Sequence, residues 1–159
     1  MERCLASRST AVLTAMMMAC SLGCGKPQGN PRERDAVKMI QKLGGKVEFD
    51  GERNDQRVIK VYLNNTALED TDLAVLEQLS KLRNLFLGKT EISDAGLKHL
   101  EGFGDLQTLS LNSTRVTDAG LERLTRLTKL KTINLQETDV TAAGVTRLRK
   151  ALPGTMIAR

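Results

Sequence analysis

The sequence repeats with a period of 24 residues from about residue 58 to residue 159. Six rows of apolar residues or threonines recur in phase through four units: Val61, Leu85, Leu109, Ile133; Leu63, Leu87, Leu111, Leu135; Thr66, Thr90, Thr114, Thr138; Leu68, Ile92, Val116, Val140; Leu73, Leu97, Leu121, Val145; and Leu76, Leu100, Leu124, Leu148. Such a period is typical of a solenoid, in which each coil buries its apolar side chains against the next. We therefore expect one stacked array of four coils at 58–159.

The spacing of apolar residues changes within each unit. Two leucines alternate around Phe86 with a period of two, which predicts a strand. Leu97 and Leu100 are three residues apart, which predicts a short helix, and Ser93 or Asp94 is a suitable N-cap before it. Each unit is therefore predicted to be a strand, a turn and a short helix.

Other recurring positions have predicted structural roles. A further row expected in the core is Leu79, Phe103, Leu127 and Ala151. The threonine hydroxyls at 66, 90, 114 and 138 are expected to satisfy backbone groups inside the turn. The carboxylates of Asp70, Asp94 and Asp118 stand at predicted helix starts, where capping and compensation of the helix dipole account for them.

Residues 31–57 are predicted to cap the first coil with a helix and a strand. Asn30 precedes Pro31, and Glu33 follows in the first turn, which is typical of a helix start. The apolar stripe of this helix is Ala36, Met39, Ile40 and Leu43. Two glycines at 44–45 end the helix, and a short strand is expected around 47–49. At the other end, Ile157 lies 24 residues after Ile133, which predicts a closing strand.

The repeated segments Ser-Asp-Ala-Gly-Leu at 93–97 and Thr-Asp-Ala-Gly-Leu at 117–121 resemble leucine-rich repeats. They are similar to the cysteine-containing-like subclass, which is found in F-box proteins and in many bacterial proteins. The resemblance implies an α/β fold: a short right-handed solenoid of strand–turn–helix coils with a parallel sheet on its concave face. The first unit departs from the pattern, because Asp70-Thr71-Asp72-Leu73 lacks the glycine.

Residues 1–24 have the features of an export signal. Arg3 and Arg8 precede a short, mainly apolar stretch, which is too short to span a bilayer comfortably. The segment ends in Ser21-Leu22-Gly23-Cys24, which resembles the lipobox of bacterial lipoproteins and implies lipidation of Cys24. Cys20 is a competing processing site. Residues 25–30 would then form a linker between the lipid and the domain.

The chain carries few residues suited to catalysis or metal binding. All three cysteines precede residue 25, so the predicted mature domain has no disulfide and no thiolate metal site. Its single histidine, His99, has no second histidine beside it and is expected on the surface. We therefore expect no enzyme activity, no metal and no cofactor.

Strand residues that alternate with the leucine rows are predicted to form a concave binding face. These residues are Lys60, Tyr62, Asn64, Asn84, Phe86, Ser110, Asn112 and Asn134. Tyr62 and Phe86 would lie on adjacent strands about 4.8 Å apart, forming an exposed aromatic patch of the kind that anchors binding partners. The alternative is that the two rings shield the first coils.

Positive charge is concentrated near the C-terminus. Acidic and basic residues balance over 1–120, so the net charge of +5 comes from residues 121–159. A basic ridge is predicted from Arg123, Arg126, Arg147, Arg149 and Lys150. It could meet an anionic membrane surface or another acidic partner, or it could be a solvated helix face. Nucleic acid is not expected, because the expected binding motifs are missing.

Together these features resemble bacterial leucine-rich-repeat lipoproteins. The resemblance implies a monomeric, non-enzymatic module in the cell envelope, lipid-anchored to a membrane, that binds a protein partner. The alternative is a cytoplasmic adaptor similar to the F-box leucine-rich-repeat proteins, which recruit substrates for ubiquitin transfer. That alternative leaves residues 1–24 unexplained, and the region before the repeats is too short for an F-box.

Overall fold

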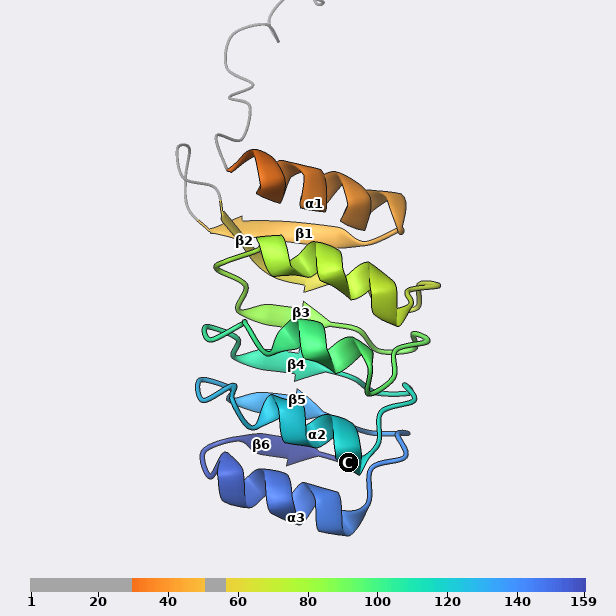
Figure 1. Ribbon diagram of the computed structural model, residues 1–159, viewed down its shortest axis with the longest axis vertical. Coiled ribbons are helices and arrows are strands. Elements are labelled where there is room, and N and C mark those ends of the chain that lie inside the picture. The colour runs from red at the N-terminus through yellow and green to blue at the C-terminus, as the bar shows by residue number, and fades with distance from the viewer. Residues whose placement is uncertain (1–29, 51–56) are drawn as a thin grey trace, which may run out of the picture.

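A computed structural model describes residues 30–50 and 57–159 of the chain. The coils stack along one axis around a six-stranded sheet of order β1-β2-β3-β4-β5-β6 (Figure 1). The elements are α1 (Pro31–Lys42), β1 (Lys46–Asp50), β2 (Arg57–Tyr62), η1 (Asp70–Gln78), β3 (Asn84–Phe86), η2 (Gly96–Leu100), β4 (Thr108–Ser110), α2 (Asp118–Leu124), β5 (Thr132–Asn134), α3 (Ala142–Ala151) and β6 (Met156–Ala158). This is the α/β solenoid that the repeats predict. The predicted signal segment, Cys24 and the linker up to residue 29 lie outside the described residues.

The 24-residue period sets the register of the sheet. Strands β2 to β6 are parallel, and the residues that pair between neighbouring strands are 24 positions apart, for example Leu85 with Leu109 and Leu109 with Ile133. Ile133 pairs with Ile157, which confirms the closing strand at the C-terminal end. Strand β1 of the cap is antiparallel to β2 and carries a bulge between Glu48 and Phe49.

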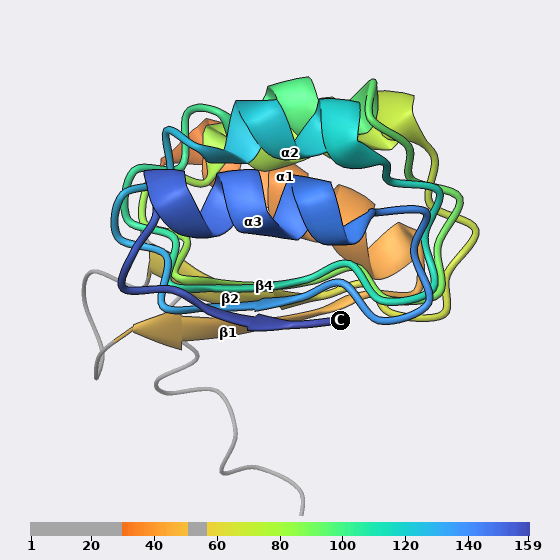
Figure 2. The same cartoon turned by 90° about the horizontal axis from the view of Figure 1, so that it is seen from below.

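The helices form one layer and the strands the other, as the view along the stack shows (Figure 2). The leucine rows fill the space between the layers and are almost inaccessible to water. The prediction that Ala151 lies in the core is wrong. Ala151 is exposed, and Leu152 is buried in its place. Helix α3 continues to Ala151, and the N–H of Leu152 donates to the carbonyl of Leu148. Four residues of helical spacing after Leu148 therefore bring Leu152, and not Ala151, to the core.

The N-terminal cap forms as predicted, but Glu33 has a different role. Asn30 Oδ1 accepts a hydrogen bond from the N–H of Arg32, Ala36 packs into the core, and Gly44 adopts a φ of 83° just after the helix. Glu33 is only 6% exposed, and its Oε1 accepts a hydrogen bond of 2.7 Å from the N–H of Val58. This acid therefore ties the cap helix to the first residues of β2.

Each coil turns after its strand through a residue in the left-handed region. These residues are Asn65, Lys89, Ser113 and Glu137, with φ between 54° and 59°. The first three donate their N–H groups to carbonyls of the next coil. In each turn the following threonine, at 66, 90, 114 or 138, donates its hydroxyl to a leucine carbonyl three residues earlier, at 2.6 to 2.7 Å. The predicted role of the threonine row is confirmed.

The helices differ between the coils. The first two coils carry 3₁₀ helices, η1 and η2, and the last two carry α-helices. Within 30–50 and 57–159, no helix combines the length and the apolar character that crossing a bilayer requires.

Candidate functional site

The strand residues that alternate with the core rows lie on the sheet face opposite the helices, which we call the open face (Figure 2). Lys60, Asn84, Thr108 and Thr132 pair in sequence across the strands, as do Tyr62, Phe86, Ser110 and Asn134. No helix or strand among the described residues covers this face. The structure thus places the predicted strand residues side by side in two rows, with Asn64 and Asn112 just beyond the strand ends.

Tyr62 and Phe86 stack face to face on the open face. Their ring centroids are 4.8 Å apart and their planes differ by 2°. This spacing equals the separation of neighbouring strands, so the parallel register itself brings the two rings into contact. The rings are half-buried rather than exposed, which corrects the prediction, because each ring covers one face of the other.

Glu48 on β1 fixes the outer edge of this pair. Its carboxylate accepts a hydrogen bond of 2.8 Å from the Tyr62 hydroxyl and lies 2.7 Å from Lys60 Nζ. Hydrogen bonds from Lys60 and then from Tyr62 lower the pKa of Glu48, and the same contacts raise the pKa of Lys60 and of Tyr62. The phenol therefore stays protonated and the ring keeps one orientation.

Sequence reasoning did not single out Glu48. A signal was present, because Glu48 stands between Val47 and Phe49 in a predicted strand and should point to the face opposite Val47. Since Val47 pairs with core residue Val61, that opposite face is the open face. The alternation would have been enough to place Glu48 near Lys60, given the antiparallel pairing.

Polar side chains beside the aromatic pair are held by the local backbone. Asn64 Oδ1 accepts from the N–H of Gly88 at 2.8 Å, which joins two coils. The Ser110 hydroxyl donates to Asn112 Oδ1 at 2.8 Å, and Asn134 Oδ1 accepts from the N–H of Gln136 at 3.0 Å. These hydrogen bonds hold the three asparagine side chains in fixed positions along the open face.

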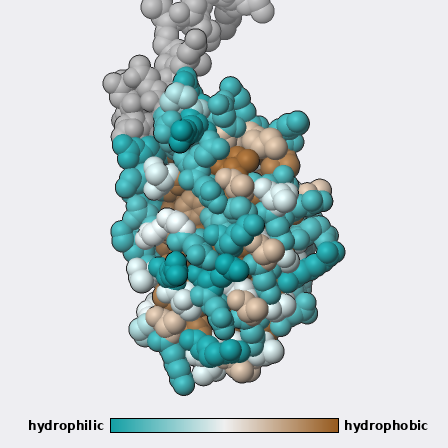
Figure 3. Space-filling model, viewed as in Figure 1, coloured by the Kyte–Doolittle hydropathy of each residue, from teal (hydrophilic) through white to brown (hydrophobic). Residues whose placement is uncertain are grey.

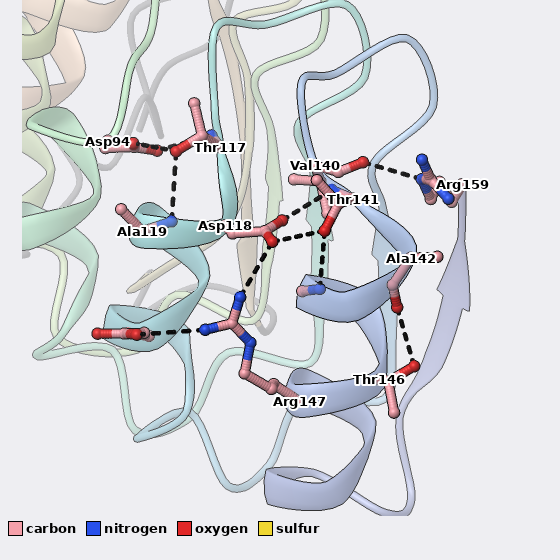
Figure 4. A network of polar contacts seen from close by, with 12 residues as sticks. Asp94, Thr117, Asp118, Ala119, Val140, Thr141, Ala142, Thr146, Arg147 and Arg159 are labelled. Atoms are coloured by element: carbon pink, nitrogen blue, oxygen red, sulfur yellow. Dashed lines mark hydrogen bonds and ion pairs between the residues drawn. The ribbon is translucent and has the colours of Figure 1, made fainter.

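The carboxylates Asp70, Asp94 and Asp118 form a ladder between coils, which we call the carboxylate ladder. Asp94 accepts from the N–H and the hydroxyl of Thr117 at 2.8 and 2.6 Å, and Asp118 does the same with Thr141 at 2.7 and 2.6 Å (Figure 4). Asp70 accepts in the same way from Ser93. The prediction that these acids cap their own helices is wrong, although Asp70 and Asp118 do lie in the first turns of η1 and α2, as compensation of the helix dipole requires. Capping falls to the Thr117 and Thr141 hydroxyls, which the acids of the preceding coil orient.

The glycines of the repeat make room for this ladder. A Cβ at Gly96, Gly120 or Gly144 would lie 2.4, 2.3 or 2.1 Å from an Oδ1 of Asp70, Asp94 or Asp118. The first unit has Asp72 where the other units have glycine, and there the Asp72 carboxylate instead accepts from the N–H of Glu69 at 3.0 Å. Among the residues that the structure describes, no carboxylate of the ladder reaches that position from the cap, so a side chain can take the place of the glycine.

The hydroxyl–carboxylate contacts also act on Asp118 electrostatically. The two hydrogen bonds from Thr141, followed by the nearby Arg147 guanidinium, lower the pKa of Asp118. Arg147 Nη2 lies 3.1 Å from Asp118 Oδ2 (Figure 4). Asp118 therefore carries a negative charge at neutral pH.

The predicted basic ridge is partly neutralised by acidic neighbours. Arg123 and Arg126 lie 2.9 and 3.6 Å from the Glu101 carboxylate, and Arg147 contacts Asp118. Arg149 and Lys150 are exposed on α3. The helix side of the molecule is mainly hydrophilic, with only small apolar areas (Figure 3). This arrangement leaves the ridge a charged helix face with less excess positive charge than its sequence suggests.

His99 is half-buried rather than on the surface, which corrects the prediction. Its Nδ1 lies 2.6 Å from Glu77 Oε1 in the preceding coil, and both residues line a hollow of about 210 Å³ beside Leu79 and Phe103. Arg123 bridges back to Glu101 over the same 22-residue separation, so His99 belongs to a repeated contact between coils. Within the described parts of the chain, no group of three His, Cys, Asp or Glu side chains is arranged to hold a metal ion.

Comparisons with known proteins give matches among solved structures. No family model and no curated protein matches the chain. Among solved structures, the chain is similar to an internalin from Listeria monocytogenes, with 24% sequence identity and a TM-score of 0.41. The match covers 55% of this chain and 31% of the internalin chain.

Proposed function

We propose that this chain is a non-enzymatic module that binds a protein partner on its open face. The observation that carries this proposal is the stacked Tyr62–Phe86 pair, which lies on a face that no described element covers. Aromatic side chains are enriched at the centres of protein interfaces, where they supply large contact areas at low entropic cost. Glu48 holds this pair in place before binding, which lowers the cost of ordering it.

The aromatic pair is not needed to complete the core. Beneath it, Val61 and Leu85 are already fully inaccessible to water, and they pack with the helices on the other face. Tyr62 and Phe86 are thus additional apolar surface on the solvent side of an otherwise finished sheet. Surface of this kind favours a role in recognition over a role in packing.

The rest of the open face suits an extended polar segment. Thr108, Ser110, Thr132 and Asn134 continue the two rows across β4 and β5 with hydroxyl and amide groups. Lys60 is paired with Glu48, so the aromatic end of the face has little excess charge. We infer a partner that places an apolar residue against the ring pair and lays polar backbone or side chains along the following strands.

We expect Phe86→Ala to weaken binding of such a partner at least about tenfold, because truncation of a central aromatic anchor removes its contact area. Wild-type and variant chains would be immobilised and exposed to cell-envelope extract, and proteins captured only by the wild type would be purified for titration. Tyr62→Phe is the comparison variant: it keeps the stacked ring and loses only the hydrogen bond to Glu48, so it should weaken binding less than Phe86→Ala. Retained binding by Phe86→Ala, together with a large fall in melting temperature, would show that the rings serve packing instead.

We further propose that the chain is exported and anchored to a membrane in the cell envelope through a lipid on Cys24. The support is the N-terminal sequence, in which Gly23 precedes Cys24 and an apolar stretch precedes both. A linker of about six residues spans at most roughly 20 Å. The domain would therefore stay close to the bilayer.

We expect Cys24→Ala to move the protein from the membrane fraction to the soluble fraction and to abolish incorporation of labelled fatty acid. Cys20→Ala is the matched control and should leave both properties unchanged. The measurement is fractionation of cells producing each variant, followed by immunoblotting and detection of the label. If the wild-type protein is found only in the cytoplasmic fraction, the lipid anchor is ruled out. That result would favour the alternative of a cytoplasmic adaptor.

A further inference from the structure

A charged cleft of about 470 Å³ lies where the chain enters strands β2 to β5. Its cations lie near the starts of three strands: Arg57 begins β2, Lys81 and Arg83 precede β3, and Lys129 precedes β5. None of these residues belongs to the open face or to the basic ridge. The cleft is therefore a separate surface, and the proposed protein binding does not use it.

The cleft contains two carboxylates that its cations share. Asp105 lies 2.6 Å from Lys129 Nζ and 3.4 Å from Lys81 Nζ, and the three residues are 24 positions apart. Asp50 lies 3.3 Å from Arg83. Lys129 and then Lys81 lower the pKa of Asp105, so this carboxylate is ionised at neutral pH. Lys81, Arg83 and Lys129 outnumber Asp50 and Asp105, so these five residues carry an excess of one positive charge.

Because the lining holds both cations and carboxylates, it favours a ligand with more than negative charge alone. The excess of cations favours an anionic ligand, but Asp50 and Asp105 would repel a ligand that carries only acceptor oxygens. A ligand that also brings hydroxyl donors can satisfy the two carboxylates, while its acidic groups accept from the lysines and Arg83. Gln107, which also lines the cleft, can both donate and accept. Acidic sugars combine these two kinds of group.

We propose that this cleft binds an acidic saccharide. The acidic group of the sugar accepts hydrogen bonds from Lys81, Arg83 and Lys129, and its hydroxyls donate to Asp50 and Asp105. The volume lies within the range of about 300–1,000 Å³ that is usual for ligand sites. The cations come from three different coils, so the cleft runs along the stack and suits a short linear oligosaccharide.

The test is calorimetric titration of the full chain with trigalacturonate at low salt, beside neutral galactotriose and tripolyphosphate. We expect trigalacturonate to bind, galactotriose not to bind, and tripolyphosphate to bind more weakly than trigalacturonate. The double variant Lys81→Gln/Lys129→Gln should lose about tenfold or more in affinity for trigalacturonate. The matched control Arg149→Gln/Lys150→Gln removes the same charge from α3 and should change the affinity less than about twofold.

Asp105→Asn separates saccharide recognition from simple attraction of charge. Loss of this carboxylate raises the net positive charge of the cleft, so it should strengthen binding of tripolyphosphate. It also removes the stronger acceptor for sugar hydroxyls, so it should weaken binding of trigalacturonate. The proposal is overturned if trigalacturonate does not bind, if the α3 control loses as much affinity as the cleft variant, or if Asp105→Asn strengthens the binding of both ligands.

Discussion

Replacing Gly144 with alanine should destabilise the protein by about 2 kcal/mol, although alanine is the better helix former. A Cβ at this position would lie 2.1 Å from Asp118 Oδ1, and its three nearest atoms all belong to that carboxylate. The carboxylate cannot withdraw without losing its hydrogen bonds to Thr141. Overpacking of this kind costs about 1–3 kcal/mol. The measurement is urea unfolding followed by circular dichroism.

Two comparisons identify the carboxylate as the cause. Gly154→Ala adds a methyl group in the same coil, where no atom lies within 4 Å, and should leave the stability nearly unchanged. Gly144→Ala made in an Asp118→Ala background should cost little or should stabilise α3, because the obstructing group is gone and the helix propensity of alanine remains. An equal loss in both backgrounds would contradict the steric account.

Replacing Leu109 with alanine should destabilise the protein by about 3–4 kcal/mol. Leu109 is 0% exposed and lies in the middle of the stack between Leu85 and Ile133. The cavity would therefore be enclosed by a coil on each side, with little freedom to collapse. The same unfolding measurement applies, and unfolding should also become less cooperative, because each coil is stabilised mainly by its neighbours.

Thr108→Ala is the matched control for Leu109→Ala, because the two residues are neighbours on β4 and face opposite sides of the sheet. Thr108 lies on the open face, so its truncation should cost less than about 0.5 kcal/mol. Similar losses for the two variants would mean that the open face is packed against something, which would also weaken the proposal of a free binding surface.

The repeat period predicts most of the fold because a stacked coil makes the same contacts at every step. Each strand, the parallel register and the stacking of Tyr62 on Phe86 follow from one number, 24, together with the alternation of strand side chains. The closing strand follows in the same way from Ile157. These features depend on the period of the apolar residues, which can be read from the sequence alone.

Contacts between coils were harder to predict because a residue type does not say which neighbour it serves. An aspartate at a helix start can accept hydrogen bonds from its own helix or from the next coil. The sequence does not distinguish the two, and the structure shows that Asp94 binds Thr117 of the next coil. Left-handed turns at Asn65, Lys89, Ser113 and Glu137 carry no glycine to mark them. Ala151 and Leu152 exchanged places because α3 is longer than the helices of the preceding coils, η1, η2 and α2.

The two candidate sites also differ in how far the sequence predicts them. The rows of the open face could be predicted, since each member sits at a fixed position in the strand. The charged cleft could not be predicted, because its acid Asp50 comes from the cap and its cations lie at the start of β2 and in the loops before β3 and β5. Lys81, Asp105 and Lys129 do recur with the period, but a mixture of signs at one repeat position resembles an ordinary solvated surface.

The carboxylate ladder has a consequence for how an array of this kind can change its length. Each carboxylate needs a glycine 26 residues further along, in the next coil, as in Asp94 with Gly120. Excision of one whole 24-residue segment within the array, or duplication of one that begins after Asp72, would leave every such pair correctly matched. A change by any other number of residues would set a carboxylate against a Cβ. Recombination between coils can therefore shorten or extend the stack only in whole steps, and the Asp–Gly pairing is what sets the step.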